Sequence, residues 1–162
     1  MPTPTSPGTS LGASPTPHDA AALHQRLLAR GIARLDDVAQ LDALGAGGDA
    51  LVLFLEDPVR VPESWDVAVV LPEVLSWLAR AGRAVPAAFV PPELGRQLSG
   101  RYGFRLFPSL VALRGGALVG VIEGMRDWAE YEAQIPLLLD SPVQERRVAL
   151  PVAAPAGERG CG

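Results

Sequence analysis

The sequence contains no lysine and only one cysteine. All 14 of its basic residues are arginine, which excludes mechanisms that need a P-loop phosphate lysine, a Schiff-base lysine or a lysine general base. Cys161 is the second residue from the C-terminus, so one chain holds no internal disulfide, no CxxC redox pair and no cysteine metal cluster. Covalent lysine chemistry and intramolecular thiol exchange are therefore not expected of this protein.

Long apolar runs and an excess of positive charge are absent as well. None of the apolar runs approaches the roughly 20 residues that span a bilayer, so we expect no membrane insertion. The net charge of -4 and the pI of about 5.1 argue against a nucleic-acid partner and suit a basic protein partner. The 162 residues, 48% of them hydrophobic, fit a single globular domain.

Both ends of the chain differ in composition from its middle. Residues 1–18 are rich in Pro, Ser and Thr, and we expect a disordered arm there. This arm lacks the basic start and the apolar stretch of a secretory signal, which favours a cytoplasmic location. Residues 141–162 mix Pro, Ala, Gly and charge without periodicity and predict a flexible C-terminal tail. The folded domain is expected to span residues 19–140.

Between these tails, helix and strand patterns alternate. Asp19 and Asp36 are the expected caps of two initial helices, and Gly115-Gly116 predicts a tight hairpin between two strands. Strands are predicted over 51–55, 87–90, 109–114 and 117–123, and later helices over 72–81, 93–101 and 127–139. Strands that alternate with helices imply parallel pairing, whereas the hairpin adds an antiparallel strand. We therefore predict an α/β domain with a mixed central sheet covered by helices.

This order of elements resembles the thioredoxin fold, a three-layer α/β/α architecture. The best local match is the segment 102–110, which is similar to the thioredoxin segment that carries a cis-proline, here Pro108. Thioredoxins place their CxxC motif between the first core strand and the helix that we expect from Pro72. The corresponding residues of this chain, 56–71, contain no cysteine. The resemblance therefore implies a thioredoxin-like domain without the redox activity.

Two longer segments resemble a narrower family. Residues 57–73 and 124–131 are similar to the HyaE/HupG/HoxO proteins, which are thioredoxin-like accessory proteins of nickel-iron uptake hydrogenase maturation. The resemblance covers residues 20–140. It implies a non-catalytic assembly chaperone without a cofactor, which binds the hydrogenase small subunit, its twin-arginine leader, or both, before export. A structural role beside another hydrogenase accessory protein is the alternative that stays open.

An acidic stretch lies where the redox motif of a thioredoxin would be. It holds six acidic residues and one basic residue, a local balance of -5: Asp49, Glu56, Asp57, Glu63, Asp66 and Glu73, with Arg60. Such a run is either an ordinary solvated face or a surface for a basic partner, because carboxylates accept paired hydrogen bonds from guanidinium groups. Its position favours the second reading, since open α/β sheets bind ligands at the carboxyl ends of their strands.

The candidate partner-binding residues share this stretch or the expected cis-proline loop, and they are Glu56, Asp57, Arg60, Glu63, Trp65, Asp66, Glu73 and Pro108. Trp65 is expected in a loop, where it is either folded back on the core or exposed as an apolar anchor. Trp77 is expected in the core. Trp128 and Tyr131 are expected to pack together on the sheet, after Asp127 caps the last helix.

Other chemical sites find little support in the sequence. Residues 45–50 match the pattern GxGxxA, but they precede a strand, so a dinucleotide site is not expected. His18 and His24 are six residues apart, which places them on different faces of a helix. The clustered carboxylates lack the spacing of a known Mg²⁺ or Ca²⁺ site. A thiol oxidoreductase that used Cys161 alone would have no resolving cysteine.

Overall fold

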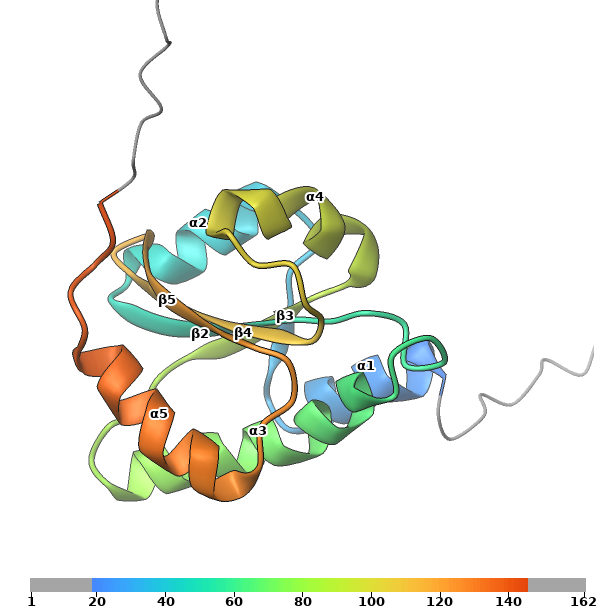
Figure 1. The fold of residues 1–162 in the computed structure, drawn as a ribbon, viewed down its shortest axis with the longest axis horizontal. Helices are drawn as coiled ribbons and strands as arrows, with labels where there is room; N and C mark the ends of the chain where they lie inside the picture. Colours follow the sequence, from blue (N-terminus) through green and yellow to red (C-terminus); the bar gives the residue numbers. More distant parts are fainter. Residues whose placement is uncertain (1–18, 146–162) are drawn as a thin grey trace, which may run out of the picture.

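A five-stranded sheet forms the centre of the computed structural model, which describes residues 19–145 (Figure 1). Its elements, in chain order, are α1 (Ala20–Ala29), β1 (Ala33–Arg34), α2 (Val38–Ala46), β2 (Asp49–Phe54), α3 (Glu63–Arg80), β3 (Ala87–Val90), α4 (Pro92–Tyr102), β4 (Ser109–Arg114), β5 (Ala117–Glu123) and α5 (Trp128–Asp140). The predicted arm over 1–18, residues 146–162 of the predicted tail, and Cys161 lie outside the described residues.

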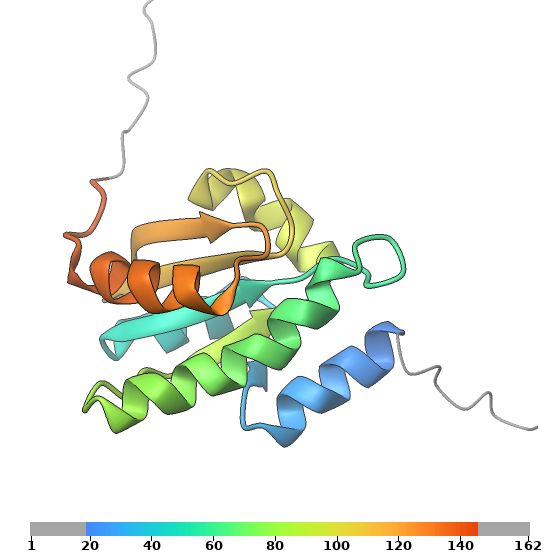
Figure 2. The ribbon, with the colours of Figure 1, turned by 60° about the horizontal axis from the view of Figure 1, so that its bottom comes forward.

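The sheet lies between two layers of helices. The strand order is β1-β3-β2-β4-β5, with β2 parallel to β3 and antiparallel to β4, so the predicted mixed sheet is confirmed. Helices α1, α3 and α5 cover one face of the sheet, and α2 and α4 cover the other (Figure 1, Figure 2). An apolar core lies on each face, and β2 contributes to both because its side chains alternate. The expected three-layer α/β/α architecture is therefore present.

Strand β2 is the buried centre of the domain. The run Leu51–Leu55 has no measurable solvent exposure, as expected for a continuous apolar strand with neighbours on both faces. At its end, the ring of Phe54 contacts the rings of Tyr102 and Phe104, at centroid distances of 5.6 and 5.0 Å. These aromatic contacts hold the end of α4 and the chain that follows it against the point where β2 ends.

The predicted hairpin and two of the predicted caps are confirmed. Gly115 and Gly116 have φ angles of 57° and 79°, which a two-residue turn between antiparallel strands requires and which glycine adopts freely. Asp19 accepts a hydrogen bond from the Ala22 N–H (2.7 Å) at the start of α1. Asp127 caps α5 as part of a reciprocal capping box.

Helix α3 begins earlier than predicted. It starts at Glu63 rather than at Pro72, so Pro72 lies inside the helix. An internal proline costs about 3 kcal/mol, because it removes one backbone hydrogen bond and crowds the preceding turn. Four apolar side chains on one face of α3 are only 2% exposed: Val67, Leu71, Val74 and Leu78. Burying four such side chains stabilises the helix by more than the proline costs. The predicted loop over 56–71 is thus a short loop followed by the first half of a helix.

Two shorter elements also differ from the prediction. Asp37, not Asp36, caps α2, because its side chain accepts the hydrogen bond from the Gln40 N–H (2.8 Å). The sequence does not predict β1, since two exposed residues carry no periodic pattern. This strand, Ala33–Arg34, extends the sheet by pairing with β3.

The residues that directly follow α5 stay in contact with the domain. The Ser141 hydroxyl donates to the Leu137 carbonyl (2.8 Å), and the Gln144 N–H donates to the Leu118 carbonyl of β5 (2.6 Å). Residues 141–145, which the sequence analysis assigns to the C-terminal tail, thus include residues that contact the domain. Composition alone does not reveal such contacts, because they depend on where the chain leaves α5.

Candidate functional site

The loops singled out by the sequence gather where β2 ends. Phe54 pairs with Ser109, so the loop that leaves β2 lies beside the segment that precedes β4. The loop after β5 joins them, because the Gly124 N–H donates to the Pro108 carbonyl (2.8 Å). Figure 2 shows these loops at the same end of the sheet. The surface formed by residues 56–66, 105–108 and 123–127 is called the β2-end face below.

Glu56 is the buried anchor of this face. Its carboxylate is bound by Arg96 of α4, whose Nη1 lies 2.6 and 2.7 Å from the two carboxylate oxygens. The Asp57 N–H also donates to Glu56 Oε1 (3.0 Å), and the Glu56 N–H donates to Ser64 Oγ (3.3 Å). Only 8% of Glu56 is exposed. The candidate binding residue Glu56 is thus paired within the domain, by an arginine 40 residues away in the sequence.

The titration of Glu56 follows from these contacts. Burial by itself raises the pKa of the Glu56 carboxyl, but the hydrogen bonds from the Asp57 N–H and from Arg96 outweigh it and lower the pKa below its ordinary value. A carboxyl whose pKa is lower in the folded chain stabilises the fold above its unfolded pKa of about 4.5. That stabilisation is lost as the pH falls through the lower, folded value.

We expect Glu56→Gln to reduce the free energy of unfolding at pH 7 by about 1.5–3 kcal/mol, the range for hydrogen bonds to a charged group. The difference from the wild type should shrink as the pH falls below 4.5, and it should vanish below the lower, folded pKa, where the wild-type carboxyl is protonated in both states. Urea denaturation at a series of pH values measures both effects. Glu132→Gln, at an exposed position of α5, is the matched control and should differ little from the wild type. A constant difference across the pH range would contradict the assignment.

Asp57 shapes the turn that follows. Its side chain accepts a hydrogen bond from the Val59 N–H (2.9 Å), and its carbonyl accepts from the N–H groups of Arg60 and Val61 (2.9 and 2.8 Å). These bonds close the chain between β2 and α3 into a compact turn. Val59 projects from this turn with 73% exposure, and Arg60 is exposed beside it.

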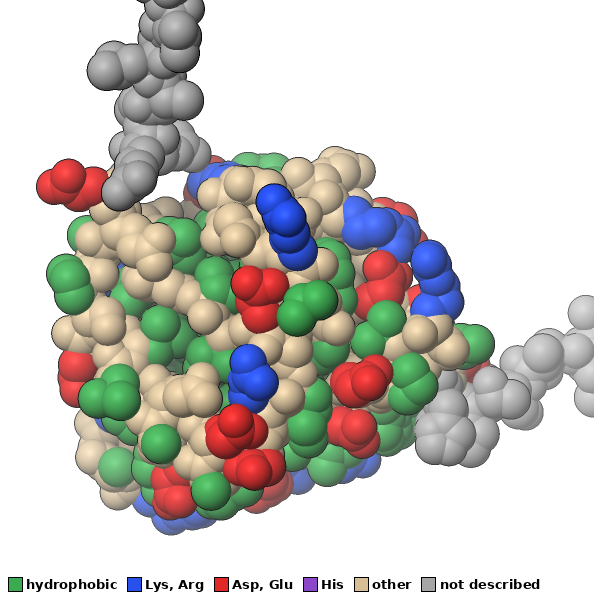
Figure 3. All heavy atoms as spheres, in the orientation of Figure 1, with side chains coloured by type: hydrophobic (Ala, Val, Ile, Leu, Met, Phe, Trp, Pro, Cys, Tyr) green, Lys and Arg blue, Asp and Glu red, His purple; other side chains and the backbone are tan. Residues whose placement is uncertain are grey.

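Glu63 and Asp66 are the exposed carboxylates of the face. Both lie in the first turn of α3, where the helix dipole stabilises negative charge and where Pro62 supplies no side-chain cap. Among the residues that the structure describes, neither Glu63 nor Asp66 forms an ion pair with an arginine. Figure 3 shows acidic side chains next to apolar ones over the start of α3. These two carboxylates are the exposed members of the predicted acidic site that lie on the β2-end face and form no ion pair within the described residues.

The remaining acids of the predicted cluster lie elsewhere. Glu73 lies in the third turn of α3, and its carboxylate pairs with Arg30 of α1 (2.5 Å). Asp49 begins β2 at the opposite end of the sheet and pairs with Arg114 (2.6 Å). The local balance of -5 along the sequence is therefore not one acidic surface, because arginines from distant elements neutralise part of it.

The tryptophans also depart from the predictions. Trp65 lies in α3 rather than in a loop, and it is half-buried against the core beneath that helix. Trp77 is half-buried and meets Trp128 of α5 edge to face, with ring centroids 6.4 Å apart. Trp128 is 39% exposed, whereas Tyr131 is buried as expected. Trp128 therefore packs between helices and not on the sheet.

The segment before β4 is held in place by a carboxylate that the sequence did not single out. The Phe107–Pro108 peptide bond is cis. Glu123, the last residue of β5, accepts hydrogen bonds from the N–H groups of Arg105 and Leu106, both at 3.0 Å. These two bonds lower the pKa of the Glu123 carboxyl. Leu106 is 60% exposed on the resulting loop. No local sequence pattern identifies this contact, since Arg105 and Leu106 lie 18 and 17 residues before Glu123 in the sequence.

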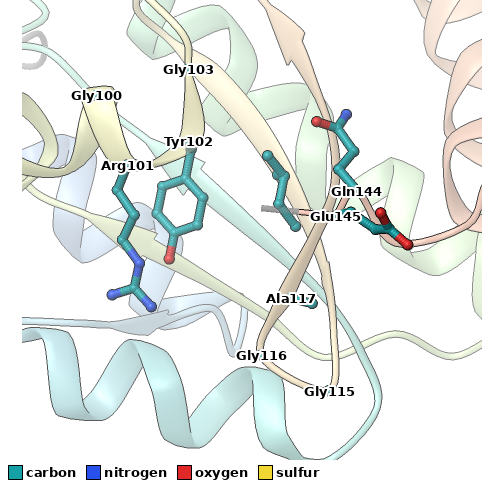
Figure 4. A pocket seen from close by; sticks show the side chains of 10 residues that line it. Gly100, Arg101, Tyr102, Gly103, Gly115, Gly116, Ala117, Gln144 and Glu145 are labelled. Carbon is teal, nitrogen blue, oxygen red and sulfur yellow. The ribbon is translucent and has the colours of Figure 1, made fainter. Parts of the chain in front are cut away.

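Two hollows lie near the ends of the sheet. One, of about 240 Å³, adjoins the β2-end face. It is lined by acidic and basic side chains, including Glu56, Arg34 and Arg96. The other, of about 670 Å³, lies beside the Gly115-Gly116 hairpin at the opposite end (Figure 4). Arg101 lines this second hollow, and its guanidinium group pairs with Asp42 (2.6 Å). Within residues 19–145, no group of three or more His, Cys, Asp or Glu side chains is placed to hold a metal ion.

Sequence comparison identifies relatives of this chain. The family described as "Hydrogenase-1 expression protein HyaE" matches residues 23–131. The hydrogenase expression/formation protein HoxO of Cupriavidus necator is 41% identical over 121 residues, which are 74% of this chain and 74% of that protein. The hydrogenase expression/formation protein HupG of Bradyrhizobium diazoefficiens is 37% identical over 97 residues, 60% of this chain and 64% of that protein.

Solved structures show the same fold. Mitochondrial thioredoxin 3 from Saccharomyces cerevisiae superimposes with a TM-score of 0.50 at 14% identity, covering 63% of this chain and 92% of that one. The thioredoxin-like fold expected from the sequence is thereby confirmed. Within residues 19–145, no helix combines the length and the apolar character needed to cross a membrane.

Proposed function

This chain belongs to the HyaE family of hydrogenase expression proteins, and from that premise we propose that it is a non-catalytic chaperone that binds the hydrogenase small subunit or its twin-arginine leader. Its relatives are named as hydrogenase expression or formation proteins, which supports a role in hydrogenase maturation. The proposed place of binding is the β2-end face, and the proposed location of the encounter is the cytoplasm, before export.

One observation carries this proposal. At the place where a thioredoxin has its two cysteines, residues 56–71 of this chain contain no cysteine and carry the exposed carboxylates of Glu63 and Asp66. Carboxylates bind guanidinium groups through paired hydrogen bonds, so this surface suits a segment with adjacent arginines. The cis-proline loop beside it, ending at Pro108, supplies the other wall of a peptide-binding surface. A peptide bound there would be held without being oxidised or reduced.

The energetics require more than charge. A single exposed ion pair contributes about 0–1 kcal/mol, whereas micromolar affinity needs about -8 kcal/mol. Two carboxylates supply only a part of this free energy. The rest has to come from apolar contact, for which Val59 and Leu106 are the exposed side chains of the face. The proposed binding is therefore mixed, partly electrostatic and partly apolar.

Affinity capture tests the function. The full chain, tagged and expressed in cells that carry the hydrogenase operon, should retain the small subunit with its leader still attached. Retention of another accessory protein without the small subunit would favour the structural alternative instead. If neither is captured after crosslinking, the chaperone proposal is wrong.

A further inference from the structure

Val59 and Leu106 are exposed although the loops that carry them are tightly held. Exposed apolar side chains are common singly and need no explanation by themselves. Here, however, Val59 directly follows the buried Pro58, and Leu106 lies two residues before the buried Pro108. The backbone is therefore packed against the domain while one apolar side chain projects from each loop. Both loops belong to the same end of the sheet.

Leu106 is fixed through its own backbone. Its N–H donates to Glu123 Oε2 (3.0 Å), and its carbonyl accepts from the Ser109 hydroxyl (2.7 Å). The N–H of Leu106 is thus bound within the chain, so a partner's backbone carbonyl could accept from it only if the bond to Glu123 were broken. Because Leu106 is 60% exposed, its side chain is what it offers to a partner. The same carboxylate also holds the N–H of Arg105, so one side chain fixes two successive residues of the loop.

Val59 is fixed through the turn beneath it. Its N–H donates to Asp57 Oδ1 (2.9 Å), while the Asp57 N–H donates to the buried Glu56 carboxylate (3.0 Å). Arg96 then ties Glu56 to α4. The chain of contacts runs from the core to the projecting side chain, so Val59 is held by the domain rather than by its own loop alone.

We propose that Val59 and Leu106 are two preorganised apolar anchors for a partner segment, and that Glu123 is the positioning residue that holds Leu106 in place. The occupant is an extended peptide segment with apolar side chains close to basic ones, since the exposed carboxylates of Glu63 and Asp66 lie on the same face. This inference rests on the proposed function. Holding the anchors rigid before binding reduces the conformational entropy that binding would otherwise remove.

Three serine substitutions test the anchors. The probe is the purified hydrogenase small subunit with its leader, titrated against the full chain. Leu106→Ser and Val59→Ser are each expected to weaken binding about tenfold, the effect of losing one buried apolar side chain. Leu137→Ser is the matched control, because Leu137 is 69% exposed on α5 and outside the face. It should bind like the wild type. If all three variants bind like the wild type, Val59 and Leu106 are not anchors for the partner, while the proposed function stands.

A double-mutant cycle tests Glu123. Glu123→Ala should weaken binding in the wild-type background and have no further effect in the Leu106→Ser background, because it acts through Leu106. Glu123→Gln keeps a side-chain carbonyl that accepts both N–H groups, so most of the affinity should return. Equal effects of Glu123→Ala in both backgrounds would overturn the positioning role. If the wild type does not bind the subunit at all, the proposed function fails together with this inference.

Discussion

Replacing Glu63 and Asp66 together by arginine is expected to weaken binding of the hydrogenase small subunit precursor about 100-fold. Each exposed carboxylate contributes up to about 1 kcal/mol of attraction, and each introduced arginine adds repulsion of similar size. The total of about 2–3 kcal/mol corresponds to a factor of roughly 30–150. Titration calorimetry at low and high salt measures the change. The wild-type affinity itself should fall as salt rises, because exposed charges are screened.

The control for this variant is a second double reversal with the same change in net charge. Glu132 and Glu145 are exposed, and both lie outside the β2-end face. Their replacement by arginine should leave the affinity within about threefold of the wild type. The α3 variant also loses favourable helix-dipole contacts of about 0.3–1 kcal/mol per carboxylate, so thermal melting has to show that it is folded. Equal weakening by both double variants would mean that net charge, and not this face, governs binding.

Phe54→Ala is expected to lower the free energy of unfolding by about 3–5 kcal/mol, the range for removing a buried aromatic ring. Phe54 is completely buried, and its ring contacts two other aromatic rings where β2 meets α4. Removing it leaves a cavity that the rigid sheet cannot fill. For a chain of this size the loss corresponds to a fall in Tm of about 10–15 °C. Urea denaturation and thermal melting measure it independently.

Leu137→Ala is the matched control for Phe54→Ala. It removes apolar atoms from an exposed position of α5, and we expect a change in unfolding free energy within about 0.5 kcal/mol. A loss below about 1 kcal/mol for Phe54→Ala would contradict the described packing of the core between β2 and α4.

The order of the main elements was predictable because their signals are local. The run Leu51–Leu55, the Gly115-Gly116 turn and the cap at Asp127 each act on neighbouring residues, and each is present as expected. The preference of proline for the first turn of a helix predicted a start at Pro72, whereas α3 begins nine residues earlier, at Glu63. In α3 the burial of one apolar face outweighs that preference, and burial depends on the rest of the fold.

The candidate site was predictable in position but not in composition. The acidic stretch does reach the end of β2, yet its charge could only be counted along the chain. Arg96 and Arg30 approach Glu56 and Glu73 from other helices, and no sequence pattern shows this. The same limit applies to Glu123, whose two backbone partners lie on a different loop. The exposed groups on which the proposed binding rests, Glu63 and Asp66 with Val59 and Leu106, are brought onto one face only by the folded domain.

The most direct test of the central claim is a calorimetric titration of the small subunit, with and without its leader, into the full chain. We predict binding on the order of micromolar, about -8 kcal/mol, to at least one form of the subunit. That affinity should fall with salt and with the reversal of Glu63 and Asp66. If neither form of the subunit binds at tens of micromolar, the proposed function is contradicted. Binding that neither salt nor the reversal of Glu63 and Asp66 affects would contradict the proposed binding face.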